Sequence, residues 1–168
     1  MPNTFTLIAS STVGAGGASS ISFSSIPSTY TDLQVVASIR GAGSYELWGT
    51  INGSSSGYTN RFVYGDGSAA ASATYQTIVL YLGEVEYSTQ TASTFSSHSI
   101  YIPNYANTSY AKSLSTESVQ ENNATASYAY MVASLWNNTS AITSFTIKPS
   151  SGTFVQYSTA YLYGVKNS

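Results

Sequence analysis

The chain has 168 residues, no cysteine and a formal net charge of -2, and only 7% of its residues are charged. This length suits one domain with a sizeable core, and the lack of thiols excludes disulfides, thiolate zinc sites and cysteine nucleophiles. Five scattered Lys and Arg residues are too few to neutralise a phosphate backbone, and no segment has the roughly 20 apolar residues of a membrane span. We therefore expect neither a nucleic acid nor a membrane as a partner.

Aromatic residues make up 14% of the chain, and 15 residues are tyrosines. Disordered chains have the opposite composition, with few aromatics and many charges. Neutral polar residues must do the solvating here, because charges are so few. The composition therefore predicts a folded domain.

Short runs in which apolar and polar residues alternate recur along the chain, and this period of two is typical of β-strands with one face on a core. The first runs are residues 5–7, 21–23 and 33–39. The Gly- and Ser-rich segment 10–20 joins the first two and could form a flexible loop or an arm. It does not separate two compositions, so it is not expected to be a domain boundary.

Residues 47–51 form the next run, which ends in Asn52-Gly53. This dipeptide is a strong hairpin signal, because both residues tolerate the positive φ angles of a tight two-residue turn. The pattern predicts residues 58–64 as the returning strand of that hairpin.

Two later segments, 74–85 and 128–136, are apolar on both faces at their centres, which predicts central strands. Residues 68–73 could form one short helical turn. The remaining strand-like runs are residues 95–102, 110–119, 142–147 and 159–165. About ten short strands with no helical counterpart predict an all-β domain over residues 1–168, a β-sandwich with a jelly roll as the first choice.

Several blocks, taken in order, resemble a group of small bacteriophage virion proteins. They are residues 21–41, 51–67, 100–119, 134–152 and 158–168, and they carry the recurring elements IPSTYTDL, W-x-N-T-x-A-I-T and YLYG-[IV]-K. Members of that group look like jelly-roll domains of head decoration or cement proteins, or of tail and fibre components. The resemblance implies a location in the virion after assembly in the host cytoplasm.

Chemical motifs are weak. The segment 53–57 matches the G-x-S-x-G pattern of serine hydrolases, but it starts in a hairpin signal and no helix is expected after it. His98 lies within a predicted strand, as a surface or inter-strand residue. Glu84 and Glu86 could form a glycosidase pair or a calcium site, but solvated strand-edge carboxylates are the simpler interpretation, and Asp66 is expected in a turn. We expect no catalytic residue, no metal site and no cofactor, and hence no enzyme.

The enrichment in Tyr, Ser, Gly and Asn suits a recognition or subunit surface, where aromatic rings give contact area and small polar groups give hydrogen bonds. It suits half-buried strands equally well. The candidate contact residues are Trp48, Tyr58, Arg61, Tyr64, Tyr105 and Trp136.

Two functions follow from these observations. The first is a decoration or cement protein that binds the major capsid protein on the outside of the capsid as a homo-oligomer, with a trimer favoured because capsid subunits meet at threefold axes. The second is a tail or fibre module that binds host surface polysaccharide, with a glycan as its partner.

Overall fold

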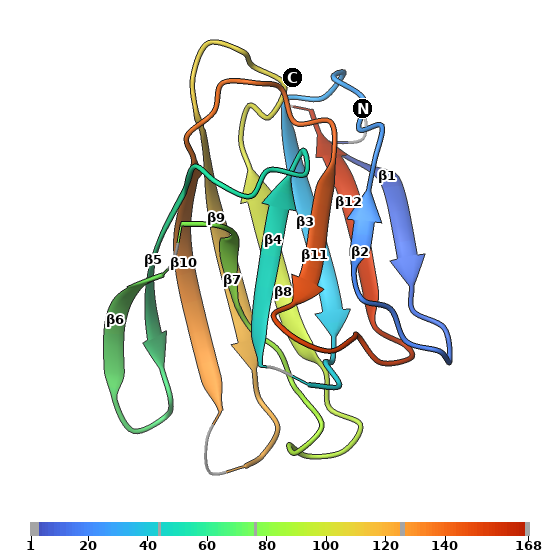
Figure 1. Cartoon of the computed structure of the whole chain (residues 1–168), viewed down its shortest axis with the longest axis vertical. Helices are drawn as coiled ribbons and strands as arrows, with labels where there is room; N and C mark the ends of the chain where they lie inside the picture. Colours follow the sequence, from blue (N-terminus) through green and yellow to red (C-terminus); the bar gives the residue numbers. More distant parts are fainter. Residues whose placement is uncertain (1–3, 44, 76, 125–126, 167–168) are drawn as a thin grey trace.

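Two antiparallel β-sheets pack face to face in the computed structural model, which describes residues 4–43, 45–75, 77–124 and 127–166 (Figure 1). The described residues form twelve strands and no helix, so the all-β sandwich expected from the sequence is confirmed. The larger sheet has the order β1 (Phe5–Thr12), β12 (Thr159–Val165), β3 (Asp32–Ile39), β8 (Ser96–Ile102), β9 (Lys112–Gln120), β10 (Tyr128–Trp136), β5 (Tyr58–Gly65) and β6 (Ala70–Tyr75). The smaller sheet has the order β2 (Ile21–Phe23), β11 (Phe145–Pro149), β4 (Glu46–Ile51) and β7 (Leu80–Glu84).

The chain crosses repeatedly between the sheets, because β2, β4, β7 and β11 in the smaller sheet are separated in sequence by strands of the larger one. Each crossing places the inward side chains of consecutive strands against one another. The resulting core includes Leu33, Ile51, Ile100 and Phe145, all fully buried. In β9 the burial alternates from residue to residue, as the period of two predicts.

The predicted hairpin between residues 47–51 and 58–64 is wrong, although its turn forms. Asn52 and Gly53 both have positive φ, and the Ser54 N–H donates to the Ile51 carbonyl at 2.9 Å. After this turn the chain passes to the other sheet, so β4 pairs with β7 and β11 while β5 pairs with β6 and β10. The local turn chemistry was readable in the sequence, but the strand partner was not.

Segment 74–85, predicted as one central strand, is divided between β6 and β7, which lie in different sheets. Its first part continues the strand 70–75, where a helical turn was considered, so that interpretation is also wrong. β7 lies at the edge of the smaller sheet, not at its centre. Segment 128–136 is an interior strand of the larger sheet, as predicted.

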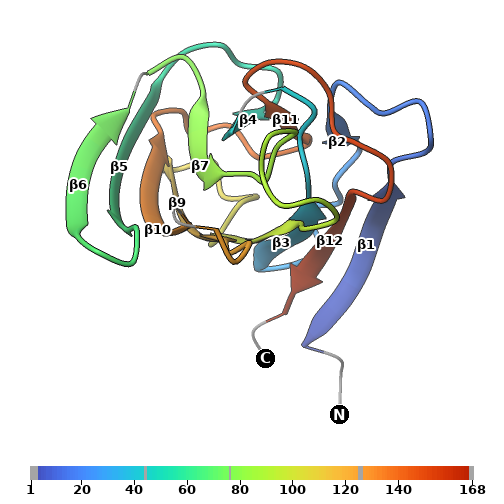
Figure 2. The same cartoon turned by 90° about the horizontal axis from the view of Figure 1, so that it is seen from below.

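β7 is buried because the larger sheet curves around it, which brings strands β5 and β6 to its side (Figure 2). Asn60 of β5 takes the place of a neighbouring strand. Its side-chain amide donates to the Val79 carbonyl at 2.9 Å, and its oxygen accepts from the Tyr81 N–H at 3.0 Å. An edge strand can therefore be apolar on both faces.

Segment 10–20 is held against the rest of the fold. Its first residues continue β1, and the buried Val13 exchanges backbone hydrogen bonds with Tyr157 and Ser158. Ala18 then forms a two-hydrogen-bond bridge with Phe154, which is itself buried. The segment therefore forms a loop that backbone hydrogen bonds hold in place near both of its ends.

Candidate functional site

The outer face of the larger sheet is the side that points away from the smaller sheet. One row of its residues runs across six strands through Val63, Met131, Glu117, Ser99, Val36 and Tyr161. Among the described strand residues on this face, Arg61 and Glu117 are the exposed charged ones. Most of the remaining side chains are apolar or small and neutral. A partner that covered this face would have few charges to desolvate.

A shallow groove lies on the outer face over β6, β5 and β10, with a volume of about 650 Å³. Met131 and Val63 rise beside it and are 60% and 54% exposed. Between them and the neighbouring strands, Ala133, Ser115 and Ser72 are small, which leaves the hollow. Large apolar side chains next to small ones form a surface that can receive an apolar side chain of another protein.

The structure separates the six candidate contact residues. Arg61 is exposed on the outer face, and Tyr64 and Trp48 are half-buried. Tyr58, Tyr105 and Trp136 are 1%, 0% and 2% exposed, so their assignment to a contact surface is corrected.

All three aromatic side chains belong to the hydrophobic core, and the two tyrosines also form hydrogen bonds through their hydroxyl groups. Tyr58 lies opposite Trp136 on the inward side of β5 and β10, and its hydroxyl accepts from the Ile51 N–H at 2.9 Å. The Tyr105 hydroxyl donates to the Pro27 carbonyl. Buried tyrosines need such partners for their hydroxyl groups. Here these hydrogen bonds hold loops against the sandwich.

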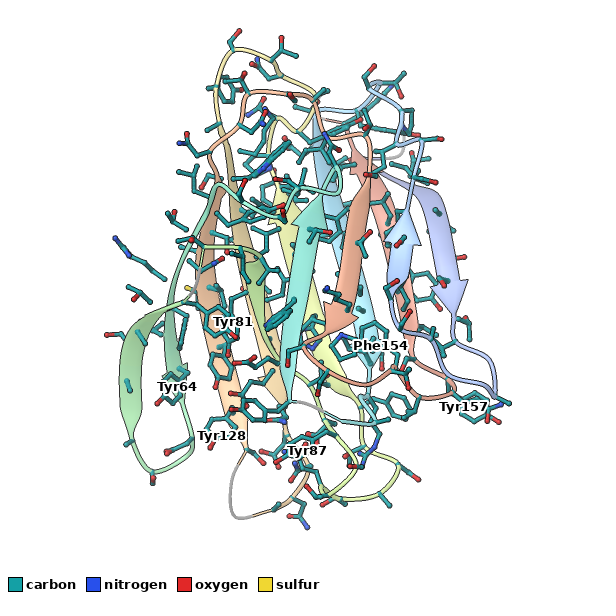
Figure 3. All side chains as sticks on the ribbon, viewed as in Figure 1. Tyr64, Tyr81, Tyr87, Tyr128, Phe154 and Tyr157 are labelled. Carbon is teal, nitrogen blue, oxygen red and sulfur yellow. The ribbon has the colours of Figure 1, made fainter. Side chains whose placement is uncertain are left out.

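A tyrosine cluster, which the sequence analysis missed, fills the space between β7 and the curled end of the larger sheet. Tyr75 stacks on Tyr81 with ring centroids 4.5 Å apart, and Tyr64 stacks on Tyr130 at 5.2 Å. Figure 3 shows Tyr64, Tyr81 and Tyr128 gathered at this end of the molecule. The aromatic members are Phe62, Tyr64, Tyr75, Tyr81, Tyr128 and Tyr130, and the buried Val132 packs with them. Alternating aromatics at 62 and 64 and at 128 and 130 were the one sequence signal for it.

Glu84 and Glu86 are not the solvated edge carboxylates that the sequence favoured. The Tyr130 hydroxyl donates to Glu84 Oε1 at 2.6 Å, and burial raises the pKa of Glu84, with Glu46 adding to the rise. Glu86 is fully buried, and its carboxylate accepts from the Asn122 side-chain amide at 2.9 and 3.2 Å. In the described part of the chain no group of three or more His, Cys, Asp or Glu residues could hold a metal ion.

Changing Glu84 to Gln should stabilise the protein at pH 7 by about 1 kcal/mol or less, because the site is partly exposed and solvent screens the charge. The raised pKa means that the fold binds the Glu84 proton more tightly than the unfolded chain does. Ionised Glu84 therefore lowers stability at neutral pH, and this cost disappears as the pH falls below the ordinary carboxyl range.

Urea unfolding at pH 7 and pH 4 measures this effect, with the exposed Glu121→Gln as the matched control. The gain for Glu84→Gln should be larger at pH 7 than at pH 4. A variant that is less stable than the parent at pH 7 would show that the carboxylate is favoured in its site.

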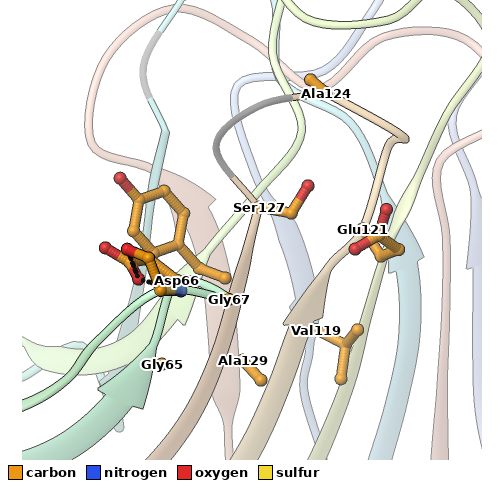
Figure 4. A pocket seen from close by; sticks show the side chains of 10 residues that line it. Gly65, Asp66, Gly67, Val119, Glu121, Ala124, Ser127 and Ala129 are labelled. Atoms are coloured by element: carbon orange, nitrogen blue, oxygen red, sulfur yellow. Dashed lines mark hydrogen bonds between the residues drawn. The ribbon is translucent and has the colours of Figure 1, made fainter.

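A pocket of about 420 Å³ opens at the end of the larger sheet, between the β5–β6 turn and the β9–β10 connection. Figure 4 shows Asp66 and Gly67 on one side of it and Glu121 and Ala124 on the other. The Tyr128 ring also lines the pocket. Two carboxylates beside an aromatic ring can bind a polyhydroxylated ligand, since carboxylates accept hydrogen bonds and the ring offers an apolar face.

Asp66 is a turn residue, as predicted. Its Oδ1 accepts from the backbone N–H groups of Ala69 and Ser68 at 2.7 and 2.8 Å and from the Ser68 hydroxyl at 2.9 Å. These hydrogen bonds hold the pKa of Asp66 below its usual range, and the one from the Ala69 N–H has the largest effect.

His98 lies in the core between the two sheets and is 1% exposed. Its Nδ1 is 3.2 Å from the Leu82 carbonyl of the smaller sheet, and its Nε2 is 2.9 Å from the Ser96 hydroxyl. Burial lowers the pKa of His98 to about 4. Segment 53–57 runs from a turn directly into β5, without the helix that a nucleophile elbow requires.

The described residues contain no helix long and apolar enough to cross a membrane. Comparisons of the chain with known protein families, with curated proteins and with solved structures find no match.

Proposed function

We propose that this chain is a structural protein of a bacteriophage virion, which binds the outside of the capsid and stabilises it. The observation that carries the proposal is the outer face of the larger sheet, where Arg61 and Glu117 are the exposed charges among the described strand residues. A capsid protein can cover such a face without a large desolvation cost. The groove beside Met131 and Val63 supplies a place for an apolar anchor of that partner.

The connectivity supports the jelly-roll assignment implied by the resemblance to small virion proteins. In the smaller sheet, β11 lies between β2 and β4, so strands from opposite ends of the chain are neighbours. Greek-key connections produce this kind of order. The larger sheet adds the β8–β9–β10 meander and the β1–β12 pair to such an arrangement.

The proposed partners are the major capsid protein and further copies of this chain, in the virion assembled in the host cytoplasm. No enzymatic step, cofactor or metal is part of the proposal. The role is mechanical, because a bound domain adds contacts between subunits and shifts their dissociation equilibrium.

The test uses capsids that lack this protein, from the phage whose genome encodes it. The purified chain should sediment with them and raise their thermal midpoint. Met131→Asp should weaken binding at least tenfold, because burying an unpaired carboxylate costs more than about 1.4 kcal/mol. Tyr157→Asp is the control, since Tyr157 is 69% exposed in a different part of the surface. Failure of the parent protein to bind any capsid preparation would contradict the proposal.

A tail or fibre module that binds polysaccharide is the second candidate, and the pocket between Asp66 and Glu121 favours it. In that case the protein should bind host cells or their isolated polysaccharide in place of capsids. Tyr128→Ala should then reduce glycan binding about tenfold, the value of roughly one ring contact. Met131→Asp should leave glycan binding unchanged, which separates the two functions.

A further inference from the structure

The two sheets have four edge strands, and three of them are protected against pairing with another chain. β2 is only three residues long. β7 has its open side covered by Asn60 of β5, as described above. β1 contains a register shift between Leu7 and Ala9, and such bulges disrupt edge pairing.

The fourth edge strand, β6, carries none of these protections. Its residues Ala70–Tyr75 include no charged residue, no proline and no bulge, and the first five are exposed. Among the strands that the structure describes, β5 is its one neighbour in the sheet. An unprotected edge of this kind is a template for another strand.

The groups that β6 offers can be assigned from the hydrogen bonds at the two ends of the β5–β6 ladder. The Asp66 N–H donates to the Ala69 carbonyl, and the Tyr58 N–H donates to the Thr77 carbonyl. Hydrogen-bonded pairs alternate along an antiparallel ladder, so residues 71, 73 and 75 bond to β5. The backbone N–H and C=O groups of Ala70, Ser72 and Thr74 therefore point to the free edge.

We propose that β6 pairs with β6 of a second copy of this chain, antiparallel and about a two-fold axis at Ser72. In this register Ser72 lies opposite Ser72 of the other copy, and Ala70 lies opposite Thr74. All three outward-facing residues of each copy then find backbone partners. Because the strand has no charged residue, self-pairing places no like charges opposite one another.

A second copy fits this edge better than a foreign peptide does. A peptide added to a sheet edge gains its specificity from pockets for its side chains. Self-pairing needs no pocket, because the two-fold register at Ser72 is the one that pairs all the outward-facing backbone groups of both strands. It would also place the grooves on the two outer faces next to each other across the axis, since Ser72 and Thr74 line each groove.

This pairing implies a dimer of the free protein, in place of the trimer that the threefold axes of a capsid favour. It does not depend on the place of the protein in a virion. The measurement is the mass of the purified chain by sedimentation equilibrium over a range of concentrations, without capsids or host cells. A dimer is expected for the parent protein.

The decisive variant is Ser72→Pro, which removes one outward N–H per copy and no hydrogen bond to β5. We expect the dimer dissociation constant to rise about a hundredfold, because two symmetry-related hydrogen bonds are lost at roughly tenfold each. Ser72→Ala keeps the backbone group and should leave the dimer intact. Ser10→Lys on the β1 edge should also leave it intact, while Ser72→Lys should dissociate it, and mixing Ser72→Lys with Ser72→Glu should restore it.

Because the chain has no cysteine, a single introduced thiol reports the register directly. Residues opposite one another in a hydrogen-bonded pair have Cα atoms about 5.5 Å apart, within disulfide reach. Ser72→Cys should therefore form a covalent dimer on oxidation, and Ser10→Cys should not. A monomeric or trimeric parent protein, or a dimer that Ser72→Pro leaves unchanged while the circular dichroism spectrum stays native, would overturn the proposal.

Discussion

Replacing Arg40 with alanine is expected to lower the free energy of unfolding by about 3 to 5 kcal/mol. The Arg40 side chain is buried, and its guanidinium donates to the carbonyls of Tyr87, Gln90, Thr91 and Thr94 at 2.7 to 3.1 Å. These carbonyls belong to the connection between β7 and β8. Alanine would leave them facing a vacated site with no donor.

The same connection ties the two sheets together, because the Gly41 N–H donates to the Glu86 carbonyl at 2.7 Å. Loss of the Arg40 contacts should therefore loosen the β7 end of the smaller sheet as well as the loop. Faster hydrogen exchange over residues 87–94 would report this opening.

Urea unfolding monitored by circular dichroism measures the effect, and Arg61→Ala provides the matched control. Arg61 is exposed, so its loss should change stability by about 0.5 kcal/mol or less. The loss of stability in Arg40→Lys should lie between the losses in Arg40→Ala and Arg61→Ala, because an ammonium group cannot reach four carbonyls in the geometry of a planar fork. A change below 1 kcal/mol for Arg40→Ala would show that water replaces the guanidinium without cost.

The second large effect is a loss of stability in mild acid through His98. Burial lowers its pKa to about 4 in the fold, against 6.5 for the free side chain. Between these values the unfolded chain binds a proton that the folded protein does not, so stability falls as the pH falls. The contribution of His98 to the free energy of unfolding is fully present above pH 6.5. About 3 kcal/mol of this free energy is lost on acidification to pH 4.

The measurement is the free energy of unfolding at steps of half a pH unit across this window. His98→Gln removes the titrating group and should flatten the profile, whatever its own stability at pH 7. Glu84 acts in the opposite direction in the lower part of the window, since its raised pKa makes the folded state gain stability on protonation. The difference between parent and His98→Gln isolates the histidine, and identical slopes would mean that His98 is not kept neutral by burial.

The exposure of the outer face did not follow from the sequence. Segment 128–136 is apolar on both faces at its centre, which predicted a strand buried on both sides, but the structure exposes residues 129, 131 and 133 on the outer face. The scarcity of charge was evident in the sequence. The groove could not be predicted, because it depends on β10 lying next to the β5–β6 pair, and these come from distant parts of the chain.

Local patterns in the sequence determined most of the strands, the turn at Asn52-Gly53 and the place of Asp66 in a turn, because these features depend on interactions between residues a few positions apart. The tertiary structure alone decided that β4 and β5 belong to different sheets, and that Tyr58, Tyr105 and Trp136 are buried. It also decided that the edge strand β7 is covered by the curl of the larger sheet. An alternating pattern gives a strand one apolar face, but which strand covers that face is settled by packing between segments far apart in sequence.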